Sequence, residues 1–550
     1  MNGADLMVQA LREAGVTHVS VLAGNGTNPL MHACRKAGLR VVDTRNEQTA
    51  AYMADATGRL TRRVGVCLVS AAVGHANALI GLVNAYFDGS PMLLISGESP
   101  EAQSGLGKFQ EMPEQVAIAA PVCKYARRVT EPEKTALYLH EALNAATSGR
   151  PGPVHLTVPM DVLEAEVDPA RVPHTPPSPG VVVQHAPGDP GLVRQAAQWL
   201  AQAERPLCVA GSGAFYADAG RALAEFAAQT DIPLVVPIWD RGVVDQPLPQ
   251  FLGVVGAASG EPRLLPDADL LLILGTAPDY RLGFLQPPRV REDVRVIRVD
   301  VDPVELRRRR EPDLAILGDV RSVVEGLSQA WRALGAEPKT EWLREARRRE
   351  RAFRRRWLEE PAPPSPMTGR HIVDALRPFA AREDVLFLVD GGNIGQWAHM
   401  ALCDRYPSRW LTCGASGVVG WGMGGAIAAK LAYPERPVLF LSGDGSFGFN
   451  IADLETAVRH RTPFVVVLAD DQAWGIVQSG QEKTLGRECL VGCQLGPVRY
   501  DLVAQGFGCR GVRAERPEEI APAVEEGLQA DCPTVIQVPI QVLAPSDLPE

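Results

Sequence analysis

The sequence predicts an α/β protein with three open α/β domains built on mainly parallel sheets. At roughly 100 to 200 residues per domain, the 550 residues are too many for one core. Two proline-rich stretches, at 171–190 and 359–366, divide the chain, because such runs stay extended and do not join a sheet. The segments between them alternate short β-branched runs with longer helical patterns, which is typical of parallel sheets with crossover helices.

The strands are predicted in order from these β-branched runs. In the first segment the runs lie at 19–22, 39–44, 64–70, 91–98 and 154–159. In the second segment they lie at 206–213, 233–237, 270–275 and 294–302. In the third segment they lie at 385–392, 409–414, 437–446, 463–470 and 532–540. The predicted domains are 1–170, 190–340 and 366–550. The arginine-rich stretch 341–360 also contains Glu and Trp, which predicts a solvated helix face without a binding function.

The composition excludes several classes of protein. Hydrophobic residues make up 46% and charged residues 22%, which is ordinary for a globular chain and excludes a disordered one. The net charge of −10 opposes binding to nucleic acid or to an anionic membrane surface. Of the ten cysteines only Cys489 and Cys493 are close together, without a histidine at ligand spacing, so neither a zinc site nor a disulfide framework is indicated. We expect reduced thiols and a cytoplasmic protein. The N-terminus has no basic start followed by an apolar region, and no 18 apolar residues run together, so we expect neither export nor a membrane span.

The third segment contains a pattern that predicts a phosphate and cation site. The run 437–446 ends in Gly-Asp-Gly-Ser, which includes Asp444, and a helical stretch follows. Glycines there let backbone N–H groups approach a phosphate at a helix N-terminus, and the aspartate can hold a divalent cation. The next run ends in Asp470 and Asp471, and Asp471 lies 27 positions after Asp444. Parallel strands end at the same edge of a sheet, so both acids could face one ion. The alternative is that these acids only cap helices.

These residues resemble the thiamin-diphosphate signature of the family that holds acetolactate synthases, pyruvate oxidases, benzoylformate decarboxylases and benzaldehyde lyase. The resemblance extends over nearly the whole chain, at 43–61, 68–97, 108–129, 251–256, 267–275, 296–303 and 414–432. It implies a pyrimidine-binding, a central and a diphosphate-binding domain, with thiamin diphosphate and Mg²⁺ as cofactors. It also implies a homodimer or homotetramer whose active site lies between the first domain of one subunit and the last domain of another.

The resemblance assigns roles to individual residues. Glu47 is expected to activate the cofactor, and burial among its apolar neighbours would raise its pKa so that it shares a proton with a ring nitrogen. The other expected catalytic residues are Gln110 and His75, where a satisfied structural histidine is the alternative for the latter. The expected cofactor contacts are Glu47, Gly392, Asn393, Val419, Gly443, Gly445, Ser446 and Ile476. The expected metal ligands are Asp444, Asp471 and the carbonyl of Ala473. The expected substrate pocket consists of Asn25, Gly26, Thr27, Asn28, His75, Phe109, Gln110, Trp474 and Gln478.

Four positions depart from the relatives. Gly26 stands where benzaldehyde lyase has a histidine, and Gly480 stands where acetolactate synthases have a tryptophan. Ala277 replaces the arginine that those synthases use near their flavin, so we do not expect FAD. Asp471 stands where the family usually has asparagine, and the additional anion beside a diphosphate makes a cation more necessary.

The expected function is cleavage or formation of a C–C bond next to a carbonyl, by a carboligase or lyase that acts on 2-oxo acids or aldehydes. The alternatives are a simple 2-oxo acid decarboxylase and acetolactate synthase-type acyl transfer. A non-catalytic subunit would be expected to lack Glu47 or the Gly-Asp-Gly sequence, and both are present. The donor, the acceptor and the stereochemistry stay open at this point.

Overall fold

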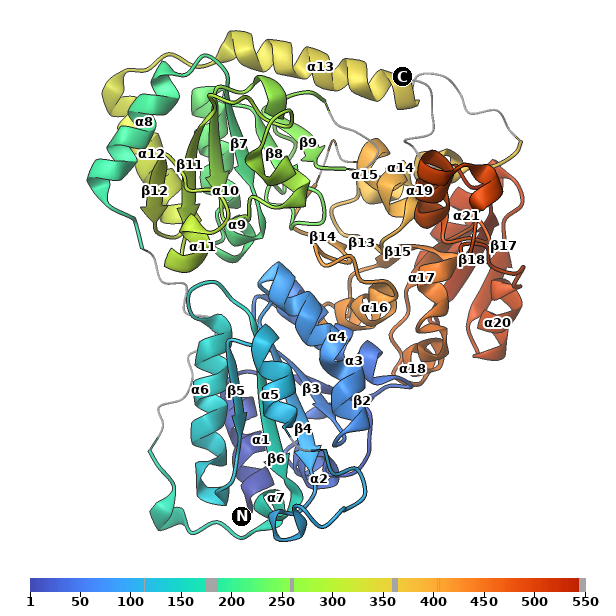
Figure 1. Cartoon of the computed structure of the whole chain (residues 1–550). Helices are drawn as coiled ribbons and strands as arrows, with labels where there is room; N and C mark the ends of the chain where they lie inside the picture. The colour runs from blue at the N-terminus through green and yellow to red at the C-terminus, as the bar shows by residue number, and fades with distance from the viewer. Residues whose placement is uncertain are drawn as a thin grey trace.

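The chain folds into three α/β domains, which form three lobes in Figure 1. This computed structural model describes residues 1–112, 114–174, 186–257, 262–358, 365–402, 404 and 406–543. Residues 175–185 and 359–364 of the two predicted proline-rich linkers lie outside the described residues. Within the described ranges, no helix combines the length and the apolar character that crossing a membrane requires.

The N-terminal domain contains a six-stranded parallel sheet in the order β2-β1-β3-β4-β6-β5. Its strands are β1 (His18–Val21), β2 (Arg40–Asp43), β3 (Gly65–Val69), β4 (Met92–Glu98), β5 (Tyr125–Arg128) and β6 (Pro153–Pro159). Its α-helices are α1 (Gly3–Glu13), α2 (Asn28–Lys36), α3 (Glu47–Thr61), α4 (Val73–Asp88), α5 (Gln115–Ala119), α6 (Thr135–Thr147) and α7 (Met160–Glu164). Short 3₁₀ turns are η1 (Glu101–Gln103), η2 (Ala120–Val122), η3 (Pro132–Lys134) and η4 (Pro169–Arg171).

The central domain has a second six-stranded sheet in the order β12-β11-β10-β7-β8-β9. Its strands are β7 (Pro206–Ala210), β8 (Leu234–Pro237), β9 (Phe251–Val255), β10 (Leu270–Leu274), β11 (Arg295–Asp300) and β12 (Leu314–Leu317). Its helices are α8 (Pro190–Gln202), α9 (Ser212–Tyr216), α10 (Gly220–Thr230), η5 (Leu265–Asp267), η6 (Tyr280–Leu285), α11 (Pro303–Arg307) and α12 (Val320–Leu334). The arginine-rich helix α13 (Thr340–Leu358) then leads toward the third domain, and Arg344 and Arg348 pair with glutamates on its own surface.

The C-terminal domain has the sheet order β14-β13-β15-β16-β18-β17, which is the same topology as that of the N-terminal domain. Its strands are β13 (Leu386–Val389), β14 (Trp410–Thr412), β15 (Val438–Gly443), β16 (Val465–Asp470), β17 (Arg510–Arg513) and β18 (Thr534–Pro539). Its helices are α14 (Gly369–Ala380), α15 (Asn393–Ala401), α16 (Trp421–Ala432), α17 (Asp444–Gly448), η7 (Ile451–Asp453), α18 (Leu454–Arg459), α19 (Gly475–Leu485), η8 (Arg487–Cys489), α20 (Tyr500–Gly506) and α21 (Pro517–Leu528).

The strands predicted from the sequence are all present, and the fold class is confirmed. The prediction missed β5, β9, β12 and β17, each of which lies at the edge of its sheet. Two of them, with the sequences YARR and RGVR, carry arginines because an edge strand is only partly covered. The apolar runs that predict strands therefore marked the interior of each sheet better than its edges.

The N-terminal and C-terminal domains meet along α3 and α16. The backbone of Gly424 comes so close to α3 that an added Cβ would lie 2.9 Å from the Cβ of Tyr52. The indole N–H of Trp421 donates to Asp55 Oδ2 at 2.8 Å, and the Arg59 guanidinium lies over the Trp421 ring at 4.8 Å. These buried contacts place the loop before α16 against the N-terminal domain.

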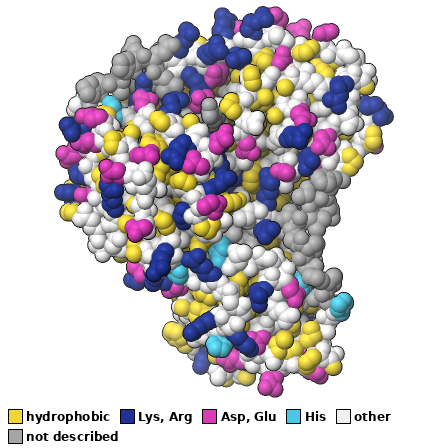
Figure 2. All heavy atoms as spheres, turned by 180° about the vertical axis from the view of Figure 1, so that it is seen from behind, with side chains coloured by type: hydrophobic (Ala, Val, Ile, Leu, Met, Phe, Trp, Pro, Cys, Tyr) yellow, Lys and Arg dark blue, Asp and Glu magenta, His cyan; other side chains and the backbone are white. Residues whose placement is uncertain are grey.

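The surface carries charges of both signs. Figure 2 shows basic and acidic side chains interspersed over the back of all three lobes. On that face neither sign of charge dominates.

Candidate functional site

Two carboxylates, the buried Asp444 and the half-buried Asp471, meet at the carboxyl edge of the C-terminal sheet. The adjacent strands β15 and β16 pair Gly443 with Ala469, so Asp444 and Asp471 follow neighbouring strand ends. Both side-chain oxygens of Asp444 are buried, and no described residue donates a hydrogen bond to them. Burial and the nearby carboxylates of Asp471 and Asp470 raise the pKa of Asp444, and burial raises the pKa of Asp471. Two acids held together in this way are suited to a divalent cation.

The neighbouring Asp470 faces away from this pair. Its Oδ2 accepts a hydrogen bond from Gln537 Nε2 at 2.6 Å inside the sheet. The next turn contains Gln472 with a positive φ of 54°, and Ala473 N–H donates to Asp471 Oδ1 at 3.2 Å. The turn thus places Asp471, rather than Asp470, beside Asp444. The described residues contain no cluster of three or more His, Cys, Asp or Glu side chains for a metal, so a cation here needs other oxygen ligands as well.

Glycine-rich loops surround the two acids. Gly392 has a φ of 86° and open space where a side chain would be, and Gly443 is nearly as open. Gly445 lies beneath the Trp474 ring, because a Cβ there would be 2.8 Å from the ring carbons. Asn393 lies next to Asp471, and its buried Oδ1 has no hydrogen-bond partner within the part of the chain that the structure describes. These open backbones and the unpartnered oxygens fit a diphosphate and its cation.

The hydroxyl of Ser446 is already committed within the protein. It donates to Asp390 Oδ2 at 2.8 Å and accepts from the backbone N–H of Gly420 at 2.9 Å. Only its backbone N–H therefore fits the expected diphosphate contact. The sequence prediction did not include Asp390, although an acid before two glycines at a strand end is a signal for it. Burial raises the pKa of Asp390 to about 6.

The residues on and before α19 lie at the rim of these loops. The Trp474 ring makes an edge contact with Phe449 at 5.9 Å, and Ile476 is exposed. Gln478 Nε2 donates to Glu482 Oε1 at 3.3 Å on the same helix. Gly480 has no neighbour within reach of an added Cβ, so this position is open. Half-buried Val419 lies in the loop just before Gly420.

Most of the N-terminal site candidates follow the carboxyl ends of β1, β2, β3 and β4. Glu47 is the first residue of α3, and its Oε2 accepts from Asn77 Nδ2 at 2.7 Å. Asn77 was not among the predicted residues. Glu47 is only half-buried in the single chain, which differs from the expected burial, because its own domain covers one side of it. Its Oε1 lies beside Gly74, where an added Cβ would be 3.4 Å away.

The loop after β1 has little room for side chains. Gly26 has a φ of 86°, and an added Cβ would lie 2.8 Å from the Cα of Gly97. Thr27 is buried, and its hydroxyl bonds to the backbone of Gly24, while Asn28 is the first residue of α2. Thr27 thus stabilises its own turn instead of facing a pocket. Asn25 and the exposed Asn28 remain as the polar candidates of this loop.

Asn25 forms a hydrogen bond to the residue just before Gln110, the predicted active-site glutamine. Its Nδ2 donates to the carbonyl of Phe109 at 3.1 Å, and the Phe109 side chain is 73% exposed. Gln110 has a positive φ of 58°, and its buried Oε1 has no hydrogen-bond partner among the described residues. Such backbone strain at a non-glycine residue is a common feature of functional sites.

His75 lies deeper than expected for a substrate contact. Its ring is fully buried, its Nδ1 bonds to Ser96 Oγ at 2.8 Å, and the His155 ring lies 4.8 Å away. Burial lowers the pKa of His75 to about 4, so the imidazole is neutral. Among the described residues its Nε2 is buried without a hydrogen-bond partner, so only one of its two ring nitrogens is satisfied, and both the catalytic role and the structural one stay predictions.

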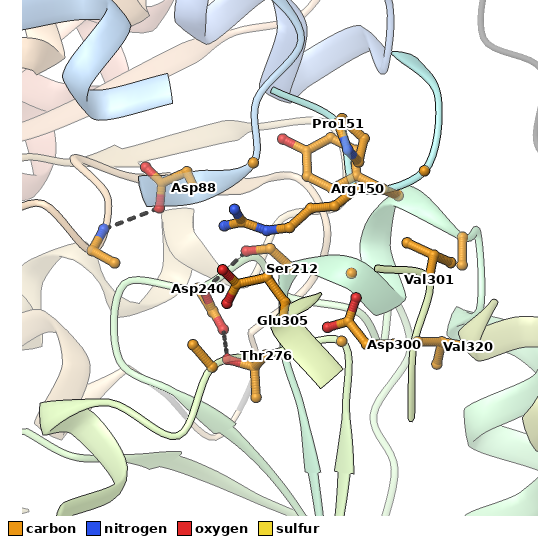
Figure 3. Close-up of a pocket in the computed structure, with 18 of the residues that line it drawn as sticks. Asp88, Arg150, Pro151, Ser212, Asp240, Thr276, Asp300, Val301, Glu305 and Val320 are labelled. Atoms are coloured by element: carbon orange, nitrogen blue, oxygen red, sulfur yellow. Dashed lines mark hydrogen bonds between the residues drawn. The ribbon is translucent and has the colours of Figure 1, made fainter. Parts of the chain in front are cut away.

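A separate cavity of about 650 Å³ lies where the three domains meet. Asp88 and Arg150 line it from the N-terminal domain, Thr276 and Asp300 from the central domain, and Ala415 from the C-terminal domain. In Figure 3 the Arg150 side chain extends toward Asp88 and Ser212. Ala277 also lines this cavity, and it occupies the position where acetolactate synthases have an arginine near their flavin.

Comparison with known proteins agrees with this architecture. Residues 1–118, 193–327 and 390–538 match the N-terminal TPP binding, central and C-terminal TPP binding domains of thiamine pyrophosphate enzymes, where thiamine pyrophosphate is thiamin diphosphate. The acetolactate synthase large subunit IlvG of Mycobacterium tuberculosis is 30% identical over 548 residues, covering 98% of this chain and 95% of that protein. Human 2-hydroxyacyl-CoA lyase 2 is 30% identical over 564 residues, covering 94% and 86%. The probable acetolactate synthase large subunit of Methanocaldococcus jannaschii is 27% identical over 565 residues, covering 98% and 92%.

The three domain matches occur in the order of the three sheets, and the relatives align over almost the full chain. The chain therefore belongs to the family of thiamin-diphosphate-dependent enzymes that includes acetolactate synthase and 2-hydroxyacyl-CoA lyase.

Proposed function

We propose that this enzyme uses thiamin diphosphate and Mg²⁺ to cleave or form a C–C bond next to the carbonyl of a 2-oxo acid or an aldehyde. The observation that carries the proposal is the adjacent pair of Asp444, which is buried, and Asp471, which is half-buried, beside open glycine loops. The bound cofactor supplies the electron sink for the bond that changes, and the protein supplies binding, orientation and a dry site.

The C-terminal edge is proposed to hold the diphosphate and its cation. Asp444, Asp471 and the carbonyl of Ala473 would bind Mg²⁺, and the adjacent Asn393 would orient the Asp471 carboxylate. The backbone N–H groups at Gly392, Gly445 and Ser446 would bind the phosphate oxygens. Val419 and Ile476 would support the rings from the apolar side, and the Trp474 ring would exclude water from Gly445.

The N-terminal edge is proposed to hold and move a proton. Asn77 occupies Oε2 of Glu47, which leaves Oε1 to exchange a proton with the cofactor's ring nitrogen. Gln110, Asn25 and Phe109 would line the acceptor pocket, together with Trp474 and Gln478 from the other edge. The buried ring of His75 would hold the Ser96 hydroxyl beneath this pocket.

A homodimer is proposed to complete the site. The contacts of Glu47 lie within its own domain, at Asn77 and beside Gly74. Exposed apolar side chains border both edges, including Leu106 and Phe109 on one domain and Val477 on the other. Burial of these surfaces against a second copy would bring the Glu47 of one subunit to the metal edge of its partner.

Flavin is not part of the proposed mechanism. Ala277 offers no positive charge at the position where flavin-containing relatives place an arginine. The cavity beside Ala277 has its own charged residues, but no step of the proposed chemistry depends on a group bound there.

The function is tested with purified enzyme, thiamin diphosphate and Mg²⁺. The substrates are pyruvate alone, pyruvate with benzaldehyde, benzoin, and a 2-hydroxyacyl-CoA, with detection of carbon dioxide and of each carbonyl product. A ligation or lyase product that Glu47→Gln does not form supports the proposal. Carbon dioxide and free aldehyde without ligation would identify a simple decarboxylase, and acetolactate from pyruvate alone would identify acetolactate synthase-type transfer. No turnover of any substrate would contradict the proposal.

A further inference from the structure

All three domains contact the backbone of one residue, Ala415. Its N–H donates to Asp88 Oδ1 of the N-terminal domain at 3.0 Å, which Figure 3 draws as the dashed line from Asp88. Its carbonyl accepts from the Tyr280 hydroxyl of the central domain at 3.1 Å. Ala415 itself lies in the C-terminal domain, in the loop between β14 and α16. These two hydrogen bonds therefore hold the loop in place through residues of the other two domains.

The same loop continues to Val419 and ends at Gly420. At this end the C-terminal domain holds it, because Gly420 N–H donates to Ser446 Oγ at 2.9 Å. The carbonyl of Gly420 accepts from Asn450 Nδ2 at 3.0 Å. Val419 lies between the two anchors, so its position depends on both of them.

Asp88 and Tyr280, which hold the loop at Ala415, are themselves fixed in place. Asp88 is buried, and its Oδ2 lies 3.7 Å from Arg59. Gly414 has a φ of 104°, and a Cβ added there would overlap Asp88 Oδ2. Partial burial raises the pKa of Tyr280 to about 12, so its phenol keeps the proton that it donates to Ala415. The loop backbone thus fits a fixed acceptor on one side and a fixed donor on the other.

We propose that Asp88 and Tyr280 are positioning residues that hold Ala415 and thereby set the position of Val419 beneath the cofactor. This inference rests on the proposed function, because the role of Val419 belongs to it. It gives the central domain a part in cofactor binding through one hydrogen bond, without a residue of that domain touching the cofactor.

Tyr280→Phe tests the inference, since the substitution removes only the hydroxyl of a half-exposed side chain. Tyr125→Phe is the matched control, because Tyr125 lies on the edge strand β5 and loses only the hydroxyl that donates to Glu141 of α6. Thiamin diphosphate is titrated into each apoenzyme with saturating Mg²⁺, and quenching of tryptophan fluorescence reports binding. Tyr280→Phe is expected to weaken binding about threefold to tenfold, the size of one neutral hydrogen bond, while the control binds normally. Asp88→Asn is also expected to weaken the binding of thiamin diphosphate.

A double-mutant cycle separates positioning from general stability. In the Val419→Ala background, the side chain that Asp88 and Tyr280 are proposed to position is truncated. Tyr280→Phe is therefore expected to change the affinity for thiamin diphosphate less than about twofold. Wild-type binding by Tyr280→Phe, or an equal effect in the Val419→Ala background, would overturn the inference. If the wild type itself does not bind thiamin diphosphate, the proposed function fails instead, so the two failures are distinguishable.

Discussion

Replacing Asp471 with asparagine changes how Mg²⁺ binding depends on pH. In the free enzyme, the burial of Asp444 and the neighbouring carboxylates of Asp471 and Asp470 raise the pKa of Asp444 to about 8. Below that pH the pair holds a proton that the metal must displace. Wild-type affinity for Mg²⁺ is therefore expected to weaken as the pH falls. In Asp471→Asn the neighbouring charge is gone, so the pKa of Asp444 falls and the proton is lost more easily.

The size of the effect follows from the proton that is displaced. Each pH unit below the raised pKa weakens metal binding by up to about tenfold. Between pH 8 and pH 6 the wild type is thus expected to lose up to about 100-fold, and Asp471→Asn clearly less. At pH 8 the wild type binds more tightly, because the amide oxygen of the variant can ligate the ion but brings no charge. At pH 6 this advantage is expected to shrink or reverse.

The assay is a Mg²⁺ titration of both proteins at pH 6, 7 and 8 with constant thiamin diphosphate, followed by tryptophan fluorescence. The ratio of the two dissociation constants removes the protonation of the cofactor's own phosphates, which is common to both proteins. A ratio that is constant from pH 6 to pH 8 would refute the reasoning, since it would mean that the two carboxylates share no proton. Asp471→Ala removes the ligand and is expected to bind Mg²⁺ more weakly than Asp471→Asn at every pH.

Four further outcomes are expected. Glu47→Gln stays folded and binds thiamin diphosphate but loses turnover, because an amide cannot relay the proton; near-normal activity would contradict this. The purified enzyme shows no stoichiometric flavin absorbance between 350 and 500 nm, roughly the range in which flavin cofactors absorb. Gly26→Ala lowers the melting temperature more than Gly38→Ala, because both have positive φ but only Gly26 lacks space for a Cβ. Burial lowers the pKa of His75 to about 4, so between about pH 6.5 and 4 only the unfolded chain gains its proton, and stability falls as the pH falls. The free energy of unfolding is measured in urea at pH 7 and at pH 5. Its decrease between these two pH values is expected to be about 2 kcal/mol smaller in His75→Gln than in the wild type.

The interior of the fold and the approach of two acids at the carboxyl edge of the C-terminal sheet were predictable from the sequence, because local patterns encode them. Strands covered on both faces read as apolar β-branched runs, and turns that approach a phosphate need glycine. Asp444 and Asp471 could be paired because neighbouring parallel strands end at the same edge. Edge strands such as β5 were missed, because partial exposure allows the arginines of its YARR sequence.

The prediction of the N-terminal site was less complete, because the identity of a residue does not reveal which group it contacts. Thr27 and His75 have side chains suited to chemistry, yet the turn at Gly24 uses the hydroxyl of Thr27, and Ser96 holds the ring of His75. Thr27 and Gly24 are three residues apart in the sequence, whereas His75 and Ser96 are 21 residues apart. Only the folded packing shows that the Thr27 hydroxyl and the Nδ1 of His75 already have partners within the protein.

The sequence by itself determined the three α/β domains, the cofactor class and the acids that suit a cation, because each depends on residues that are near in the chain or follow adjacent strands. Tertiary structure decided which of these groups remain available. It turned Asp470 toward Gln537 and committed the Ser446 hydroxyl to Asp390. It also brought Tyr280 to the backbone of Ala415, 135 positions away. The physical reason is that burial forces each polar group to find a partner, and that partner is set by how the domains pack.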